Sequence, residues 1–237
     1  PSDLIVLVMG MTGVGKSSFI SSLVGEDVGI GHGVDSCTAG LTLHCMEAEN
    51  RKVYLVDTPG FNDTWRSDDA ILKEIAYFLA QTYRTGLRVG GIVYLHSIAE
   101  NRVTGSAAKN FAMLERLCGP DAARQLILAT TKWDLVGDEA DQREAELIST
   151  KKFWGTMFEN GSRVQRWDGH RPSALAIVQS LTVRADTFDL VPLRIQLELV
   201  DQSLALEDTL AGQEILQVCT QSWQNIRAEL DDIRTEL

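Results

Sequence analysis

The sequence has few of the features that mark a membrane-spanning or nucleic-acid-binding protein. No apolar run in its 237 residues approaches the roughly 18 residues that a membrane-spanning helix needs. Acidic residues outnumber basic ones by 33 to 22, and the formal charge of -11 argues against broad contact with nucleic acid or an anionic membrane surface. A nucleotide is still allowed as a ligand, because a few local groups are enough to hold its phosphates.

Cysteine is also scarce, and its spacing excludes the usual cysteine motifs. Cys37, Cys45, Cys118 and Cys219 form no CxxC pair, which argues against a zinc site or a redox motif. We expect small buried thiols in a reducing compartment. Because the chain begins at Pro1 without a methionine, we expect an excised piece of a longer protein. We expect that protein to be cytoplasmic, or to lie at the cytosolic face of a membrane if an anchor lies elsewhere.

Short apolar runs alternate with longer amphipathic stretches, a pattern that predicts an α/β fold with helices flanking a sheet. Only a few polar residues around Asn50 separate the second and third strands, so this pair is predicted to be an antiparallel hairpin. We therefore expect a mostly parallel six-stranded sheet with one antiparallel strand. The predicted strands are residues 4–9, 41–46, 52–57, 91–96, 125–130 and 163–167, and the predicted helices are 16–24, 68–84, 106–117, 139–158 and 173–181.

The alternation stops near Thr182, which predicts a main domain over residues 1–182 and a helical extension over 183–237. Near the end, apolar residues recur at steps of three and four, the spacing of a coiled-coil seam. A helix that packs this stripe against its own domain explains the spacing equally well. The stripe consists of Leu216, Cys219, Trp223, Ile226, Leu230, Ile233 and Leu237.

A glycine-rich segment, Gly10 to Ser17, fits the phosphate-loop pattern GxxxxGK[ST] between an apolar strand and a helix. Its glycines let backbone N–H groups curl around phosphate oxygens, while Lys16 reaches the β and γ phosphates and Ser17 offers a hydroxyl to Mg²⁺. The expected nucleotide-binding residues of this segment are Gly10, Thr12, Gly13, Val14, Gly15, Lys16, Ser17 and Ser18.

Two further motifs follow in order. The strand over residues 52–57 ends in Asp57-Thr58-Pro59-Gly60, where the carboxylate can hold magnesium and the Gly60 amide can sense the γ-phosphate. Thr131-Lys132-Trp133-Asp134 follows another strand and resembles the [NT]KxD motif of GTPases. The Asp134 carboxylate can accept hydrogen bonds from groups that guanine presents and adenine does not, and the Lys132 stem can cover the purine face.

Together these motifs resemble the AIG1/GIMAP and Toc branch of septin-related GTPases. The segment from Gly31 to Thr38, the DTPGF at Asp57 to Phe61 and the Thr-Lys-x-Asp form carry the resemblance, which covers residues 4–181. Residues 91–101 and the Leu117-Cys118-Gly119 triplet are similar to fungal AIG1-like GTPases. The resemblance implies a Ras-like P-loop G domain.

The resemblance also suggests roles for residues outside the three motifs. Thr38 matches the family's switch I threonine and is expected to meet the γ-phosphate and Mg²⁺, with Thr42 as the alternative. Ser173-Ala174 matches the loop that lines guanine, although a serine there can also simply cap a helix.

Phe61 stands where Ras-like enzymes carry the glutamine that orients the attacking water, so slow intrinsic hydrolysis is expected. Candidate helpers are His32, His96 and Arg102. Each has a structural reading as well, and Arg102 is favoured because an arginine can stabilise charge on the transferring phosphoryl group, often across an interface.

The sequence thus predicts a GTP-hydrolysing switch that uses Mg²⁺ and self-associates as a nucleotide-dependent homodimer. We expect no contact of this segment with nucleic acid or membrane. A structural module that binds GTP or GDP with negligible hydrolysis is the alternative, and an ATPase is disfavoured by Asp134.

Overall fold

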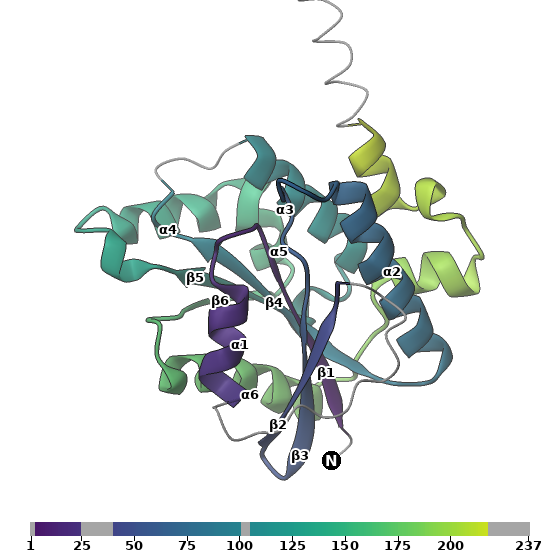
Figure 1. Ribbon diagram of the computed structural model, residues 1–237, viewed down its shortest axis with the longest axis horizontal. Coiled ribbons are helices and arrows are strands. Elements are labelled where there is room, and N and C mark those ends of the chain that lie inside the picture. The colour runs from purple at the N-terminus through teal and green to yellow at the C-terminus, as the bar shows by residue number, and fades with distance from the viewer. Residues whose placement is uncertain (1–2, 25–39, 101–104, 218–237) are drawn as a thin grey trace, which may run out of the picture.

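A six-stranded sheet forms the centre of the protein, in the order β2-β3-β1-β4-β5-β6 (Figure 1). The structure, a computed structural model, describes residues 3–24, 40–100 and 105–217. β2 and β3 are antiparallel, and the other neighbouring pairs are parallel, so the predicted sheet is confirmed. The strands are β1 (Leu4–Gly10), β2 (Thr42–Ala48), β3 (Arg51–Asp57), β4 (Val89–Ser97), β5 (Leu126–Thr131) and β6 (Arg163–Arg166).

The hairpin between β2 and β3 turns in two residues. Glu49 and Asn50 both have positive φ, at 52° and 61°, as the commonest two-residue hairpin turn requires. The register pairs Ala48 with Arg51 directly across this turn. The antiparallel hairpin predicted around Asn50 is therefore confirmed.

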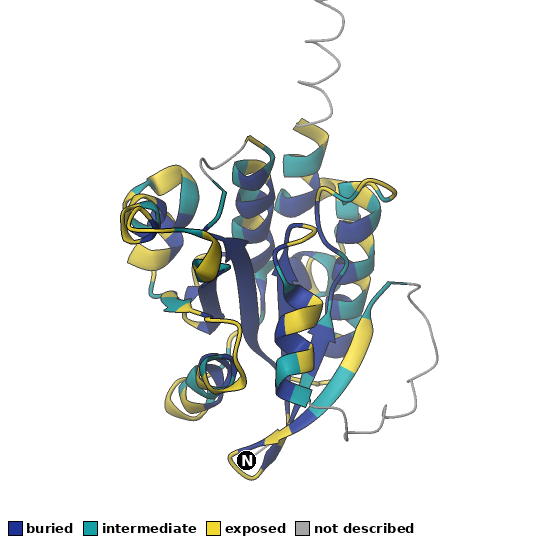
Figure 2. Cartoon of the chain, turned by 60° about the vertical axis from the view of Figure 1, so that its left-hand side comes forward, coloured by how far each residue is buried: buried dark blue, intermediate teal, exposed yellow. Residues whose placement is uncertain are grey.

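Helices cover both faces of the sheet, which explains why β1 and β4 are buried along their whole length (Figure 2). α1 and α6 pack on one face, while α2, α3 and α7 pack on the other. This is the three-layer arrangement of a Ras-like G domain. The helices are α1 (Lys16–Val24), α2 (Asp68–Arg84), α3 (Gly105–Cys118), α4 (Ala140–Ser149), α5 (Thr156–Glu159), α6 (Arg171–Thr187) and α7 (Arg194–Gln196).

The single helix predicted over residues 139–158 is wrong, because a π-helical turn at Lys151–Gly155 separates α4 from α5. Phe153 has φ -114° and ψ -120°, which no helix adopts. Leu147 and Trp154 are both buried in the core and lie seven residues apart, a spacing that a continuous helix would also produce. Periodicity therefore could not reveal the break.

The residues after α6 pack against the main core. α6 itself continues past the expected end at residue 181 to Thr187. Leu193, Ile195 and Ala211 then join the cluster formed with α2 and α3, and the Gln196 amide donates to the Leu79 carbonyl at 2.9 Å. The domain boundary at residue 182 stays a prediction, and most of the predicted coiled-coil seam lies outside the described residues.

Short helical pieces fill the rest of this C-terminal part. They are a π-helical turn at Leu197–Asp201, a 3-10 turn at Leu206–Asp208 and a further helix over residues 210–217. Across residues 3–24, 40–100 and 105–217, no helix is both long and apolar enough to cross a membrane.

Candidate nucleotide site

The loop between β1 and α1 has the conformation of a phosphate loop. Gly13 has φ +83° and no atom within 4 Å of the position a side chain would take, so a ligand can approach its backbone closely. Gly15 has φ +106° and packs against the Trp167 ring. Val14 is buried beneath the loop, and Thr131 Oγ1 donates to its carbonyl at 2.8 Å.

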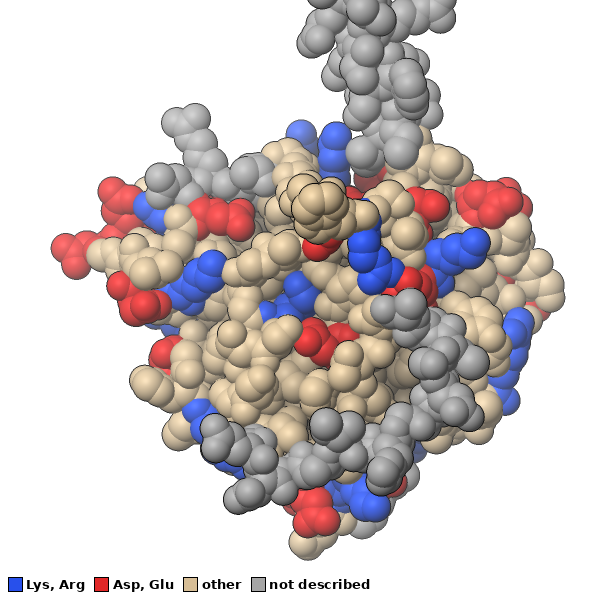
Figure 3. Space-filling view, in the orientation of Figure 1, with Lys and Arg blue, Asp and Glu red and all other residues tan. Residues whose placement is uncertain are grey.

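A cavity of about 450 Å³ opens beside this loop, on the face shown in Figure 3, where acidic and basic atoms lie close together at the centre. It brings the phosphate-loop residues together with the predicted Asp57, Gly60 and Thr42. Sequence reasoning assigned no role to Gly40, Thr58, Pro59 or Asp63. The complete lining is Thr12, Gly13, Gly15, Lys16, Ser17, Ser18, Gly40, Thr42, Asp57, Thr58, Pro59, Gly60 and Asp63.

Lys16 lies folded into the loop rather than extended into solvent. Its Nζ donates to the carbonyls of Gly10 at 3.2 Å and Met11 at 3.0 Å. Burial lowers the pKa of the Lys16 ammonium, while the carboxylates of Asp57 and Asp63 act in the opposite direction. The cation is thus held at the floor of a cavity that has two carboxylates beside it.

Ser17 and Asp57 form a pair that suits a magnesium ion. Ser17 Oγ donates to Asp57 Oδ2 at 2.7 Å. Asp57 Oδ1 is buried, and within the described residues it has no hydrogen-bond partner. A buried carboxylate oxygen without a partner is costly, and a hard cation would relieve that cost. The hydroxyl and carboxylate oxygens present therefore fit Mg²⁺.

The phosphate loop is joined directly to the segment after β3. Thr12 N donates to the Phe61 carbonyl at 2.9 Å, and Phe61 N donates to the Gly10 carbonyl at 3.3 Å. A side chain at Gly60 would overlap Thr12, so only glycine fits there. Phe61 is fully buried in the core, and the first acidic side chain after it that reaches the cavity is Asp63, with Oδ2 3.4 Å from Thr12 Oγ1.

The predicted base-reading residues follow β5 at the same edge of the sheet. Thr131 is buried, Lys132 is half-buried, and Asp134 is exposed in a 3-10 turn, Trp133–Leu135. Lys132 has φ 60° and ψ 41°, the left-handed conformation that side chains other than glycine adopt rarely. The hydrogen bond from Thr131 to Val14 therefore joins this loop directly to the phosphate loop.

Ser173 and Ala174 lie inside α6, some distance along the chain from the end of β6. Ser173 Oγ contacts Asp168, and Ala174 is fully buried in the core. Trp167 lies beside the base-reading loop, since its backbone N–H donates at 2.9 Å to the carbonyl of Thr130, the residue directly before that loop. The role of Ser173-Ala174 stays a prediction. Sequence reasoning assigned no role to Trp167, although its place at the end of the predicted strand 163–167 could have drawn attention to it.

The structure describes only some of the predicted switch I and helper residues. Thr38, His32 and Arg102 lie outside the described residues. His96 is buried, packs edge-on against Trp154 with ring centroids 5.9 Å apart, and is absent from the cavity lining.

Comparison with known proteins agrees with this site. GTP-binding protein A of Dictyostelium discoideum is 27% identical over 126 residues, 53% of this chain and 27% of the relative. GTPase Der of Gemmatimonas aurantiaca is 28% identical over 193 residues, 77% of this chain and 41% of the relative. The chain therefore spans less than half the length of these curated relatives.

The fold has solved counterparts as well. Toc33 from Arabidopsis thaliana, in complex with GDP and Mg²⁺, matches with a TM-score of 0.61 and 18% identity over 79% of this chain and 86% of the other. The family model of the AIG1 family matches residues 4–152, well over half of the chain. The chain, with its phosphate loop, Asp57-to-Gly60 segment and Thr-Lys-x-Asp loop at one sheet edge, belongs to the AIG1 family.

Proposed function

We propose that this chain binds guanine nucleotide with Mg²⁺ and hydrolyses GTP to GDP and phosphate. The observation that carries the proposal is the single cavity in which Lys16, the Ser17–Asp57 pair and Gly60 meet. The base-reading loop is tied to the same phosphate loop through Thr131. The solved Toc33 structures hold GDP or GMPPNP with Mg²⁺, which supports the same ligands here.

Each group of the cavity has a distinct task in this proposal. Backbone amides of the phosphate loop hold the phosphates, and Lys16 exchanges its two carbonyl partners for β and γ phosphate oxygens. Ser17 and Asp57 hold Mg²⁺, together with Thr38 or Thr42. When bound, the ion neutralises charge on the β and γ phosphates. The Gly60 amide senses the γ-phosphate, so loss of that phosphate changes the contact between this segment and Thr12.

Guanine is proposed to lie against Lys132 with its N–H groups on the Asp134 carboxylate. Asp134 is exposed and therefore available to a base. Guanine offers a ring N–H and an exocyclic amine on one edge, and a carboxylate can accept both hydrogen bonds. Ser173 and Ala174, in the first turn of α6, remain the family-based assignment for the residues on the other side of the base.

Hydrolysis is proposed to be slow in the monomer and to depend on a second copy of the chain. Phe61 is buried and cannot orient water, so a group from elsewhere must complete the site. We assign Arg102 to this task. Dimerization is described as important for the GTPase activity of the chloroplast translocon components atToc33 and psToc159, which makes a nucleotide-dependent homodimer the favoured form here. We place the protein in the cytoplasm or at the cytosolic face of a membrane.

The alternative function is a module that binds GTP or GDP to join subunits and hydrolyses it negligibly. The burial of Phe61 favours this alternative, because a fully buried phenylalanine supports the core and takes no part in hydrolysis. Single-turnover GTP hydrolysis at increasing protein concentration separates the two functions. A rate per molecule that rises with concentration supports the dimeric GTPase, and no hydrolysis at any concentration supports the module.

Nucleotide binding itself is tested with Lys16→Ala. This variant removes Lys16, the only cation among the described residues that line the cavity, and should abolish tight GTP binding, measured by calorimetry or a fluorescent analogue. Lys73→Ala, on the exposed side of α2, is the matched control and should bind as the wild type does. Wild-type affinity in Lys16→Ala would overturn the proposed function.

A further inference from the structure

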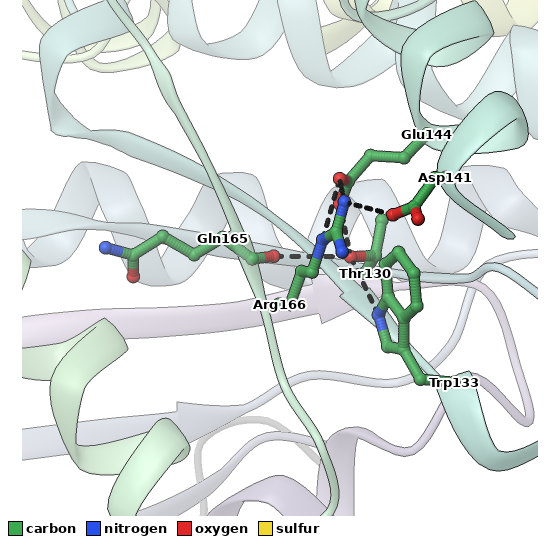
Figure 4. A network of polar contacts seen from close by, with 6 residues as sticks. All are labelled: Thr130, Trp133, Asp141, Glu144, Gln165 and Arg166. Carbon is green, nitrogen blue, oxygen red and sulfur yellow. Dashed lines mark hydrogen bonds and ion pairs between the residues drawn. The ribbon is translucent and has the colours of Figure 1, made fainter.

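A polar network joins Trp133 of the base-reading loop to residues that lie outside the nucleotide motifs (Figure 4). It joins Thr130 at the end of β5, Trp133 in the loop, Glu144 on α4 and Arg166 at the end of β6. Glu144 is buried, with 7% of its surface exposed, so its charge needs partners inside the protein.

Hydrogen bonds lead from Trp133 through Thr130 to Glu144. Trp133 Nε1 donates to Thr130 Oγ1 at 3.1 Å, and Thr130 Oγ1 donates to Glu144 Oε1 at 2.9 Å. The Gln165 carbonyl, 3.4 Å from the same hydroxyl, competes for its single hydrogen, and the nearer charged acceptor is preferred. The Glu144 carboxylate therefore orients the Thr130 hydroxyl, and that hydroxyl in turn holds the Trp133 ring through its N–H group.

Arg166 stacks over the face of the same tryptophan ring. Its Nε donates to Glu144 Oε2 at 2.8 Å, its Nη2 also contacts Glu144, and a second ion pair at 2.8 Å reaches Asp141. The guanidinium carbon lies 4.1 Å from the centroid of the Trp133 ring, a cation–π contact. One ring is thus held through both its N–H group and its face.

The residue between these anchors has the strained conformation. Lys132 lies in the left-handed region, which non-glycine residues keep only where the surroundings impose it. Thr131 on one side is anchored to the Val14 carbonyl, and Trp133 on the other side is anchored by the network. The two anchors set the backbone that carries Lys132 and, one residue beyond Trp133, Asp134.

We propose that Glu144 and Arg166 are positioning residues for guanine recognition, acting through Trp133 to hold Lys132 and Asp134 in the base-reading arrangement. The inference rests on the proposed function and names residues outside its motifs. A carboxylate that accepts two hydrogen bonds from one base edge must be fixed in direction, so a loosened loop loses discrimination between bases as well as affinity.

The test compares two ligands that differ by a single group. GDP carries the exocyclic amine of guanine, while IDP lacks it, so the ratio of their dissociation constants reports how well Asp134 is placed. Glu144→Gln keeps the side-chain shape and removes the charge, and Arg166→Lys keeps the charge and removes the planar stack. Each is expected to lower the GDP-over-IDP preference by about tenfold.

The ion pair between Arg51 and Asp186 supplies the matched control. It joins β3 to α6 and involves none of the base-loop residues. Asp186→Asn breaks this ion pair and is expected to lower the melting temperature, while leaving the GDP-over-IDP ratio within about twofold of the wild type. Trp133→Phe keeps the ring and loses the N–H donor, and it should give an intermediate ratio.

The outcomes separate the inference from the proposed function. If Glu144→Gln and Arg166→Lys melt at lower temperature yet keep the wild-type ratio, the network is only structural and the inference is overturned. If the wild type itself does not prefer GDP to ADP and IDP, the proposed function fails and the inference fails with it. A reduced ratio in both variants, with the Asp186→Asn control unchanged, supports the inference.

Discussion

Ser17 Oγ donates to Asp57 Oδ2 at 2.7 Å, while Asp57 Oδ1 is buried and has no partner within the described residues. Ser17 lies in α1, which follows β1, and Asp57 ends β3, which pairs with β1 in the sheet. We predict that Ser17→Ala weakens Mg²⁺ affinity in the nucleotide complex by about 10-fold or more, because one oxygen ligand is lost. Titration of Mg²⁺ against a fluorescent GDP analogue measures this.

Ser21→Ala is the control, since Ser21 lies on the exposed side of the same helix. It should retain the wild-type Mg²⁺ dependence. Equal Mg²⁺ affinity in Ser17→Ala and Ser21→Ala would remove Ser17 from the metal site.

Asp63 places a negative charge in the cavity that is proposed to receive phosphate. Asp63→Asn keeps the Oδ1 atom that accepts the Trp65 N–H at 2.8 Å but removes the charge. We predict that GTP affinity rises several-fold, with a smaller rise for GDP, because the γ-phosphate adds the most charge. The gain should shrink with added salt.

Asp121→Asn, an exposed aspartate remote from the cavity lining, serves as the comparison for Asp63. It should leave both affinities unchanged. Weaker GTP binding in Asp63→Asn would instead indicate that the Asp63 carboxylate supports the loop or the bound nucleotide directly.

The sequence was sufficient for the sheet because each strand is a short apolar run bounded by polar residues. The hairpin was predictable from the few residues around Asn50, and its two left-handed residues agree. The break at Phe153 was not predictable, because the seven-residue spacing of Leu147 and Trp154 suits a continuous helix as well. Local periodicity cannot show where a helix kinks to reach the core.

For the site, the contiguous motifs were visible and the tertiary partners were not. Lys16 and Asp57 each lie in a recognisable string of residues, and the fold brings them to one cavity. Glu144 and Arg166 are 22 residues apart and meet only because α4 packs beside the end of β6. No spacing rule relates such residues, so only the structure could reveal that they support the base-reading loop.

Asp134→Asn tests the base itself. An amide presents N–H donors where guanine needs an acceptor, so GTP affinity should fall by about 10-fold or more while xanthosine triphosphate, which offers an oxygen there, should gain affinity. Competition between the two nucleotides on wild type and variant measures the exchange. If ATP competes as well as GTP against the unmutated protein, the guanine assignment is wrong.

His96 is predicted to stay neutral over the physiological range. Burial lowers its pKa to about 4 from the ordinary 6.5. As pH falls below about 6.5, the unfolded chain takes up a proton that folded His96 does not, so the free energy of unfolding falls until about pH 4. His96→Phe should therefore lose about 2 kcal/mol less stability than the wild type between pH 7 and pH 5.

The direct measurement for His96 is the titration of its ring resonance by NMR. A midpoint near 4, unaffected by GTP, is expected for a side chain outside the cavity. A midpoint near 6.5 would return His96 to the candidates that assist hydrolysis.

Phe61 occupies the position of the water-orienting glutamine yet is fully buried. Restoring the glutamine should not create a faster enzyme. Phe61→Gln places an amide among apolar side chains and should cost about 3 kcal/mol or more, since loss of a buried phenylalanine is costly and the amide lacks partners there. GTP hydrolysis per folded molecule should not increase.

The backbone around Phe61 makes this prediction specific. Its carbonyl and N–H bind Thr12 and Gly10, so the direction of the side chain is set by the same contacts that shape the phosphate loop. Phe61→Leu keeps an apolar side chain and should lose less stability, with GTP affinity close to that of the wild type. Thermal unfolding and single-turnover rates on all three proteins decide the matter. A Phe61→Gln variant that melts with the wild type and hydrolyses GTP faster would show that the side chain can leave the core and act on water.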